Sequence, residues 1–209
     1  MSTSAARPAV SAEPVCAAEC TLAARLGAVL FRHRGWLPVF FLLVPLLAPG
    51  STSPAQWAIG LALVVAGEWL RLAGVAAAGT VTRRRSRRVH RLVTYGPFAW
   101  SRNPLYNGNF LVWMGFGIVS GVFWFLPIAV LIFVAEYTLI VRYEEGVLES
   151  IFGQEYLAYK ARTPRWIPRA PSLREHGPRH YREAWRSEVS TFMQYGALVA
   201  AFVVKQQLS

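Results

Sequence analysis

Polar residues able to bind a ligand gather in two segments that flank a long apolar stretch. The first segment, residues 95–108, contains Arg102, Asn103 and Pro104 in succession. Its Gly-Pro pair at 96–97 predicts a turn, and Pro104 favours an extended Asn103 while suiting the first turn of a following helix. We therefore expect backbone amides near Arg102 to be unbonded, beside a helix N-terminus that favours anions. The Arg102 guanidinium can hold a carboxylate there through two hydrogen bonds.

The second segment begins where the apolar stretch ends, at Arg142, and continues through Tyr156 and Tyr159 to a proline-bounded stretch at 164–168. Near its start it carries two carboxylates. Glu144 and Glu145 are adjacent and can accept hydrogen bonds from amines and hydroxyls. The apolar residues that follow group along one side of a helix, which predicts an amphipathic helix that lies at a membrane interface and closes over a pocket. These residues are Val147, Leu148, Ile151 and Phe152.

The composition of the chain indicates where such a site would lie. The 209 residues are 54% hydrophobic, with a mean hydropathy of +0.32, yet they carry a formal net charge of +11. Membrane proteins readily combine these properties, because their apolar spans face lipid while basic loops stay in the cytosol. Nucleic-acid binding is the other common reason for strong positive charge. Here the basic residues lie between long apolar stretches and form no nucleic-acid motif, so the chain is predicted to have no nucleic-acid partner.

Five apolar segments predict the elements that position the two polar segments. They cover residues 36–48, 55–78, 105–119, 122–141 and 191–204. The first is short and contains two prolines, whereas the second is long enough to cross a bilayer. Only Ser120 and Gly121 separate the third from the fourth, which predicts an antiparallel helical hairpin. The expected fold is all-α: an integral membrane bundle of about five transmembrane helices.

The charges of the loops predict the orientation of this bundle. Basic residues precede the first apolar segment, form an arginine run at 83–91 and return with Arg142. The loops at 49–54 and 120–121 carry no charge. Basic and neutral loops therefore alternate, which places the N-terminus and both polar segments on the cytosolic side. We expect a cofactor pocket at this cytosolic face.

The sequence also predicts the domain boundaries and the roles of residues outside the two polar segments. Residues 1–24 are expected to be a disordered N-terminal segment, residues 25–171 a membrane domain, and residues 172–209 a polar connector followed by a hydrophobic helix. Cys16 and Cys20 lack a nearby histidine, so no metal site is predicted. Within the apolar segments, Glu68 and Arg71 are three residues apart and can form an ion pair on one helical face, or can line an acceptor site. Glu136 is a further ionisable residue at membrane depth.

Taken together, the two polar segments resemble the membrane methyltransferase superfamily of isoprenylcysteine carboxyl methyltransferase and the phospholipid N-methyltransferases. That family shows a G-P-[YF]-x-x-x-R-[HN]-P-x-Y-x-G element and a helical hairpin. An E-E-x-x-L-x-x-x-F-G-x-x-Y-x-x-Y element and a closing Pro-rich stretch follow. The resemblance covers residues 92–168. The matching residues are Gly96, Pro97, Phe98, Arg102, Asn103, Pro104, Tyr106, Gly108, Glu144, Glu145, Leu148, Phe152, Gly153, Tyr156 and Tyr159.

This resemblance implies an activity for residues 25–171, which would form a membrane methyltransferase domain. The implied cofactor is S-adenosylmethionine, and the implied acceptor is a lipid-like or prenylated molecule that enters from the bilayer. Methyl transfer from a sulfonium needs alignment with a nucleophile and exclusion of water more than it needs a strong acid or base. Aromatic faces and carboxylates near the sulfonium favour its positive charge.

The resemblance also assigns roles to individual residues. Residues 96–98 and Asn103 would approach the adenosine, whereas Arg102 and Tyr106 would lie near the methionine part and the reacting centre. The two adjacent carboxylates would bond polar groups of the cofactor, and two tyrosines would cover it. The implied catalytic residues are Arg102, Tyr106 and Glu145. The implied cofactor-binding residues are Gly96, Pro97, Phe98, Arg102, Asn103, Pro104, Tyr106, Glu144, Glu145, Tyr156 and Tyr159.

One departure from the family pattern leaves the acceptor open. Isoprenylcysteine enzymes typically carry histidine after the motif arginine, and this chain has Asn103. Asparagine can still pair with an adenine edge, because it offers both a donor and an acceptor. The accepting atom and the oligomeric state stay open. The alternatives are an NADPH-dependent reductase of sterol-reductase-like architecture and a non-catalytic membrane scaffold, and cofactor binding would separate all three.

Overall fold

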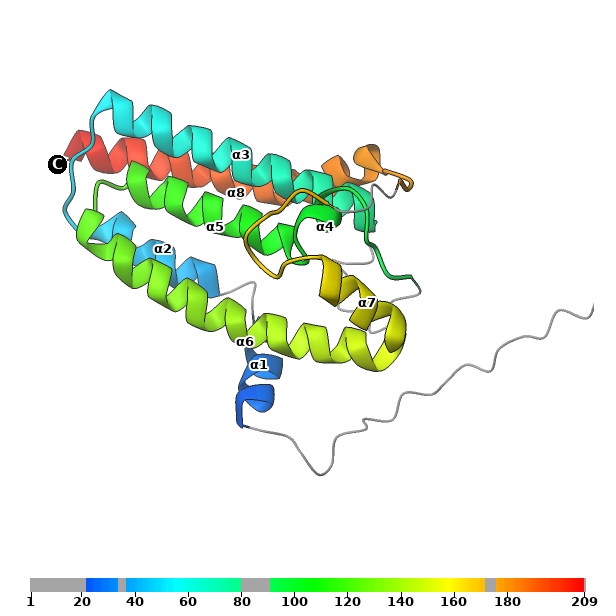
Figure 1. The fold of residues 1–209 in the computed structure, drawn as a ribbon. Helices are drawn as coiled ribbons and strands as arrows, with labels where there is room; N and C mark the ends of the chain where they lie inside the picture. Colours follow the sequence, from blue (N-terminus) through cyan, green and yellow to red (C-terminus); the bar gives the residue numbers. More distant parts are fainter. Residues whose placement is uncertain (1–21, 34–36, 80–90, 172–175, 209) are drawn as a thin grey trace, which may run out of the picture.

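The computed structural model describes residues 22–33, 37–79, 91–171 and 176–208, and Figure 1 shows their helical arrangement. Within these residues every regular element is a helix, which confirms the predicted all-α fold. The two cysteines and most of the arginine run lie outside the described residues. The α-helices are α1 (Leu22–His33), α2 (Leu37–Leu47), α3 (Pro54–Ala78), α4 (Pro97–Trp100), α5 (Pro104–Val119), α6 (Leu126–Phe152), α7 (Gln154–Arg162) and α8 (Tyr181–Leu208).

Among the residues that the structure describes, three helices are long and apolar enough to cross a membrane. They are α3, α6 together with the 3₁₀ turn that precedes it (Phe123–Phe152), and α8. The other two predicted spans correspond to shorter helices, since α2 has 11 residues and α5 has 16. At 1.5 Å per residue these extend about 16 Å and about 24 Å, short of the ~30 Å hydrocarbon core. The structure therefore gives three candidate spans, and five crossings stay a prediction.

Helices α3 and α5 pack closely through glycines that face one another. A Cβ atom built on Gly67 would lie 2.6 Å from the carbonyl oxygen of Gly108, and one built on Gly108 would lie 2.6 Å from that of Gly67. Gly60 repeats the arrangement one contact further along, where its Cβ would lie 2.7 Å from the carbonyl oxygen of Gly115. Small residues of this kind let helix backbones approach inside a bilayer. The pair therefore forms the rigid centre of the bundle, with α8 alongside (Figure 1).

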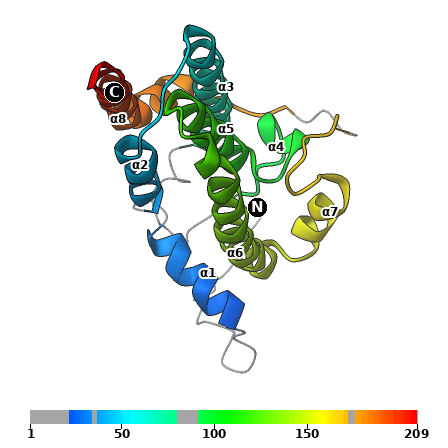
Figure 2. The ribbon, with the colours of Figure 1, turned by 90° about the vertical axis from the view of Figure 1, so that its left-hand side faces the viewer.

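Helices α5 and α6 form the predicted hairpin, and they diverge with distance from their turn (Figure 1). The turn depends on Gly121, whose φ of 71° is unfavourable for other residues, and on the Ser120 hydroxyl, which donates to the Gly117 carbonyl at 2.6 Å. Buried aromatic residues fill the space between the helices, including Phe133 and Tyr137. The end view in Figure 2 places α4 and α7 on one side of these helices and α2 and α8 on the other.

Helix α6 extends well past the predicted end of its apolar segment at residue 141. Nothing in residues 142–152 breaks a helix except Gly146, which is exposed and tolerated there. The helix ends at Gly153, which has a φ of 52°, and α7 begins at the next residue. Glu144 and Glu145 therefore lie inside a continuous helix rather than at its end, and that helix holds both carboxylates rigidly.

Helix α1 was not among the predicted apolar segments. It begins at Leu22, within the segment expected to be disordered, and residues 1–21 lie outside the described part of the chain. It packs against α6, where the Cβ of Gly27 would come within 2.6 Å of the Leu139 carbonyl oxygen.

Candidate active site

The two polar segments meet at the end of the bundle where α5 and α6 are furthest apart. One side consists of α4 and the start of α5, and the other consists of the end of α6. Helix α7 and the non-helical residues that follow it, 163–171, run between these two sides (Figure 1). We call residues 163–171 the strap.

A glycine turn and two prolines set the first side of the site. Gly96 has a φ of 63° and precedes Pro97, which starts the short helix α4. Pro104 occupies the first turn of α5, and Asn103 before it is non-helical, with φ of −125° and ψ of 52°. Both features follow the sequence prediction, because Gly adopts positive φ at low cost and Pro suits a helix start.

Side chains of this first side hold the strap through its backbone carbonyls. The Ser101 hydroxyl and the Asn103 side-chain amide both donate to the carbonyl oxygen of Arg165, each at 3.1 Å. The Asn107 amide donates to the Trp166 carbonyl at 2.8 Å and to the Ser101 oxygen at 3.1 Å. Three polar side chains are therefore devoted to one short piece of extended chain.

Backbone amides strengthen the same attachment. The Arg102 amide donates to the Pro164 carbonyl at 2.9 Å, and the Arg169 amide donates to the Trp100 carbonyl at 3.0 Å. The Asn103 amide donates to the Ser101 hydroxyl oxygen at 3.3 Å. The expectation of unbonded amides near Arg102 was wrong, because the strap supplies carbonyl partners that the local sequence does not reveal.

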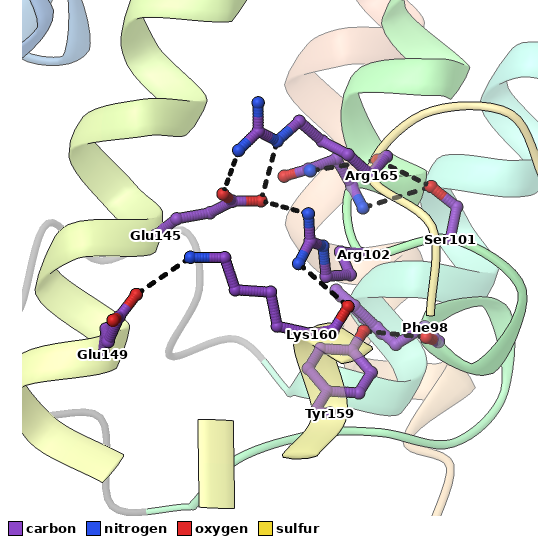
Figure 3. Close-up of polar contacts among 9 residues, drawn as sticks. Phe98, Ser101, Arg102, Glu145, Glu149, Tyr159, Lys160 and Arg165 are labelled. Carbon is purple, nitrogen blue, oxygen red and sulfur yellow. Dashed lines mark hydrogen bonds and ion pairs between the residues drawn. The ribbon is translucent and has the colours of Figure 1, made fainter. Parts of the chain in front are cut away.

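At the centre of the site, Glu145 lies between two guanidinium groups (Figure 3). Arg165 binds it in a bidentate manner, with Nε 3.1 Å from Oε1 and one terminal nitrogen 2.6 Å from Oε2. Arg102 approaches from the other side, with a terminal nitrogen 3.1 Å from Oε1. The hydrogen bonds to Glu145 raise the pKa of Arg165 above its usual range. The carboxylate is thus held from two sides.

The three side chains of this cluster differ in exposure. Arg102 and Glu145 are 8% and 6% exposed, whereas Arg165 is 33% exposed. The Nε of Arg102 is buried and has no hydrogen-bond partner among the described residues. A buried guanidinium nitrogen without a partner is costly, and a bound polar ligand could supply the missing acceptor.

The second carboxylate, Glu144, faces the start of α5. Its oxygen accepts a hydrogen bond from the Tyr106 hydroxyl at 2.8 Å. The Tyr106 ring packs on Tyr137, with ring centroids 4.7 Å apart. Tyr106 is therefore fixed from both sides, by its hydroxyl and by its ring.

The two tyrosines of α7 are both buried against the first side of the site. The Tyr159 hydroxyl donates to the Phe98 carbonyl at 2.7 Å (Figure 3). Tyr156 lies next to it, with ring centroids 6.1 Å apart. Burial raises the pKa of both phenols above the usual value, so both remain neutral.

The structure brings most of the sequence-predicted site residues together. Arg102 contacts Glu145, Tyr106 contacts Glu144, and Tyr159 contacts Phe98. Asn103 points its amide at the strap, where it holds a backbone carbonyl. The sequence prediction assigned no role to four contributing residues. They are Ser101, Asn107, Arg165 and Lys160, whose backbone carbonyl accepts a hydrogen bond from a terminal nitrogen of Arg102 at 3.4 Å. Ser101 and Asn107 stand inside the quoted motif as variable positions, and this placement was the only signal for them.

A second polar cluster lies deeper, between α3, α5 and α8. Arg71 pairs with Glu68 at 2.9 Å, as the spacing predicted, and with Glu188 of α8 at 3.2 Å. Arg71 also donates to the Asn109 side chain, and the Tyr195 hydroxyl donates to Glu68 at 3.2 Å. These contacts connect three helices, which favours a structural role over an acceptor site.

Two further features concern metal and charge. Among the described residues no group of three His, Cys, Asp or Glu side chains could hold a metal ion. Glu136 of α6 is 5% exposed, and no side chain in the described segments hydrogen-bonds to it.

The fold and the site define a class: an all-helical integral membrane protein with a cluster of polar side chains at one end of its bundle. The predicted cofactor pocket at this end stays a prediction. The model of the phospholipid methyltransferase family matches residues 55–155. These residues include the α3–α5 pair, the hairpin, Arg102 and both carboxylates.

Individual relatives agree with this match. The cobalt-zinc-cadmium resistance protein CzcN of Cupriavidus metallidurans is 30% identical over 83% of this chain and 78% of its own length. The protein-S-isoprenylcysteine O-methyltransferase of Mus musculus is 36% identical over 53% of this chain and 41% of its own length. The human enzyme is 37% identical, over 52% of this chain and 40% of its own length. No solved structure matches the chain.

The chain therefore belongs to the family of membrane methyltransferases that includes the phospholipid and isoprenylcysteine enzymes. This confirms the family resemblance inferred from the two motifs. The family uses S-adenosylmethionine as its methyl donor.

Proposed function

We propose that this protein transfers a methyl group from S-adenosylmethionine to a lipid-like or prenylated acceptor at the cytosolic face of the membrane. The observation that carries the proposal is the meeting of the two motif segments around Glu145. Arg102 and Glu145 lie far apart in the sequence, yet their side chains form a buried ion pair at 3.1 Å. Beside it, the Nε of Arg102 remains able to donate to a ligand.

The residues present fit such a cofactor, which supplies an activated methyl group when bound. Glu144 and Glu145 can accept hydrogen bonds from its amino and hydroxyl groups, because carboxylates are strong acceptors. The turn at 96–98 and Asn103 would lie near its adenosine. The phenyl faces of Tyr106, Tyr156 and Tyr159 would border a positive charge favourably.

In this proposal the chain itself would exclude water and position the reactants. The strap and α7 close the open end of the hairpin, and both tyrosines of α7 are buried there. Excluding water strengthens every electrostatic contact inside such a site. Arg102 would orient the acceptor or the methionine part with its buried guanidinium, and the Tyr106 hydroxyl would hold Glu144 in place.

Access for a lipid-like acceptor would come from the bilayer alongside α6. The side chains of Leu131 and Val134 on this helix are exposed at 70% and 54%, as expected for residues that face lipid. The loop charges support a cytosolic location of the site and the N-terminus.

The test is a calorimetric titration of the detergent-purified protein with S-adenosylmethionine, S-adenosylhomocysteine and NADPH. We expect the first two to bind, and Glu145→Ala to abolish that binding. The matched control is Glu149→Ala, one turn further along α6, where the carboxylate is 40% exposed. Binding of NADPH alone would overturn the proposal in favour of a reductase. Binding of none would favour a non-catalytic scaffold.

A further inference from the structure

The bidentate pair between Arg165 and Glu145 presents opposite charges at the edge of the site. Arg165 is the more exposed partner, at 33% against 6% for Glu145. Arg165 lies in the closing Pro-rich stretch of the family resemblance, but the resemblance assigned it no role. Its partly exposed guanidinium at the edge of the cluster is placed where a ligand could reach it.

The strap is held independently of the Arg165 side chain. Ser101 and Asn103 donate to the backbone carbonyl of Arg165, and the Arg102 amide donates to the carbonyl of the preceding residue, Pro164. The guanidinium can therefore change partners while the strap stays attached. Movement of the Arg165 side chain would therefore leave the backbone attachment of the strap intact.

Glu145 remains paired if Arg165 moves away. Arg102 would still contact Oε1 at 3.1 Å, so the buried carboxylate would not be left alone, a situation that is strongly destabilising. Oε2, now bonded by Arg165 at 2.6 Å, would become available to another donor. The released guanidinium would in turn need an anion.

A molecule with an ammonium and a carboxylate on one carbon satisfies both groups at once. Its ammonium would take the place of Arg165 at Glu145, and its carboxylate would bind Arg165 in a fork-like arrangement. Because the ligand end carries one positive and one negative charge, the net charge of the site does not change. Both Glu145 and Arg165 keep a partner of opposite charge. Among ligand chemistries, an α-amino acid end has this combination.

We propose that Arg165 and Glu145 form the subsite for the α-amino-carboxylate end of the cofactor, with Arg165 exchanging Glu145 for the ligand carboxylate. This inference rests on the proposed function, since S-adenosylmethionine carries such an end. Arg165 is then a specificity residue for the amino acid part, while the adenosine is bound elsewhere.

The test compares two ligands that differ in this end alone. S-adenosylhomocysteine has the amino acid, and 5′-methylthioadenosine keeps the adenosine and the thioether without it. Both ligands are titrated into the detergent-purified protein. Arg165→Gln should lower the affinity for S-adenosylhomocysteine by about tenfold or more, and should change the affinity for methylthioadenosine by less than about twofold. Arg165→Lys keeps the positive charge but cannot form the bidentate contact. Its affinity for S-adenosylhomocysteine should lie between those of the unchanged protein and Arg165→Gln.

Arg169→Gln is the matched control on the same strap, because its side chain contacts only the Arg162 carbonyl, at 3.5 Å, among the contacts of the described residues. It should leave both ligands unchanged. Thermal unfolding of each variant establishes that it is folded; if Arg165→Gln is not, the same ligand comparison with Arg165→Lys decides.

Three outcomes would overturn the inference while leaving the proposed function standing. The first is an equal loss of affinity for both ligands, and the second is no change in affinity for either. The third is tighter binding of S-adenosylhomocysteine by Arg165→Gln, which would mean that Arg165 only blocks the site. Failure of the unchanged protein to bind either ligand would instead remove the proposed function, and this inference with it.

Discussion

In the part of the chain that the structure describes, two clusters of arginine and glutamate side chains can be compared, and they hold different kinds of structure together. In the inner cluster, one guanidinium, Arg71, lies between two carboxylates contributed by α3 and α8. In the outer cluster, one carboxylate, Glu145, lies between two guanidiniums contributed by α5's leading segment and by the strap. The inner cluster connects regular helices, whereas the outer one connects a helix to extended chain.

The difference shows how one pair of residue types serves two purposes. Glu188 in the inner cluster has no exposed side-chain surface, and every partner is on a helix that spans much of the bundle. Exchange of partners there would require helices to separate. In the outer cluster, Arg165 can leave without moving any helix. Rigidity is therefore concentrated near the α3–α5–α8 contact, and adaptability at the edge of the site.

The largest effect is expected from Arg102→Ala, which should reduce methyl transfer by about 1,000-fold, equivalent to about 4 kcal/mol in the barrier. The protein should remain folded, because Glu145 keeps its bidentate bonds to Arg165. Turnover with a radiolabelled methyl donor and thermal unfolding in detergent would measure the two properties. Near-normal turnover would remove Arg102 from the proposed site. The outer cluster would then be structural, as the inner one is.

The opposite pattern is expected from Arg71→Met in the inner cluster. Two buried carboxylates would lose their shared partner, which should lower the free energy of unfolding by about 3 kcal/mol. The affinity of the folded protein for the cofactor should change little. Unfolding in mixed detergent micelles would measure the loss, with Arg142→Met at an exposed position of α6 as the control.

A triple variant sharpens this prediction. Arg71→Met combined with Glu68→Leu and Glu188→Leu should recover most of the lost stability, because apolar side chains can replace a buried ion cluster without a large cost. If the triple variant is as unstable as the single one, the cluster has a specific role beyond neutralising its own charges.

A smaller effect is expected from Tyr159→Phe at the boundary of the site. The Phe98 carbonyl would lose its donor at 2.7 Å, which should cost about 1 kcal/mol of stability and weaken cofactor binding a few-fold. Tyr181→Phe, at an exposed position at the start of α8, is the matched control. Equal behaviour of the two variants would show that α7 does not depend on this contact.

The smallest effect is expected at the ion pair between Glu149 and Lys160, which lies beside the outer cluster. Both side chains are about as exposed as a typical surface pair, at 40% and 36%. Glu149→Gln should change the free energy of unfolding by less than about 0.5 kcal/mol. Added salt should not increase this difference between the variant and the unchanged protein, because salt screens exposed charges. A larger loss would extend the outer cluster to include this pair.

Much of the fold follows from the sequence because hydropathy and helix breakers act locally. The hairpin turn at Gly121 and the start of α5 at Pro104 were both predicted. The length of α6 was not, since the helix continues beyond the apolar residues until Gly153 ends it. The facing glycines of α3 and α5 also went unpredicted, because their role depends on which two helices meet.

The site was predicted in part for a similar reason. Side chains in the motif, such as Arg102 and Glu145, carry a recognisable pattern of residue types, and the structure brings these two together. The strap is held through its backbone carbonyls. Because every residue has one, the residue types in the sequence do not reveal which carbonyls accept these hydrogen bonds. Glu188 is distant along the chain from Arg71, so its place in the inner cluster depends on where α8 packs.

The attachment of the strap has a consequence for how this scaffold can evolve. Ser101, Asn103 and Asn107 bind carbonyl oxygens that every amino acid provides. Side chains such as Arg165 and the exposed Ile167 can therefore be substituted without removing these hydrogen bonds, whereas Trp166 also packs against the buried aromatic cluster. The fold separates the task of attaching this segment from the task of selecting a ligand. Single substitutions on the strap can thus retune the chemistry at the edge of the site while the underlying framework stays unchanged.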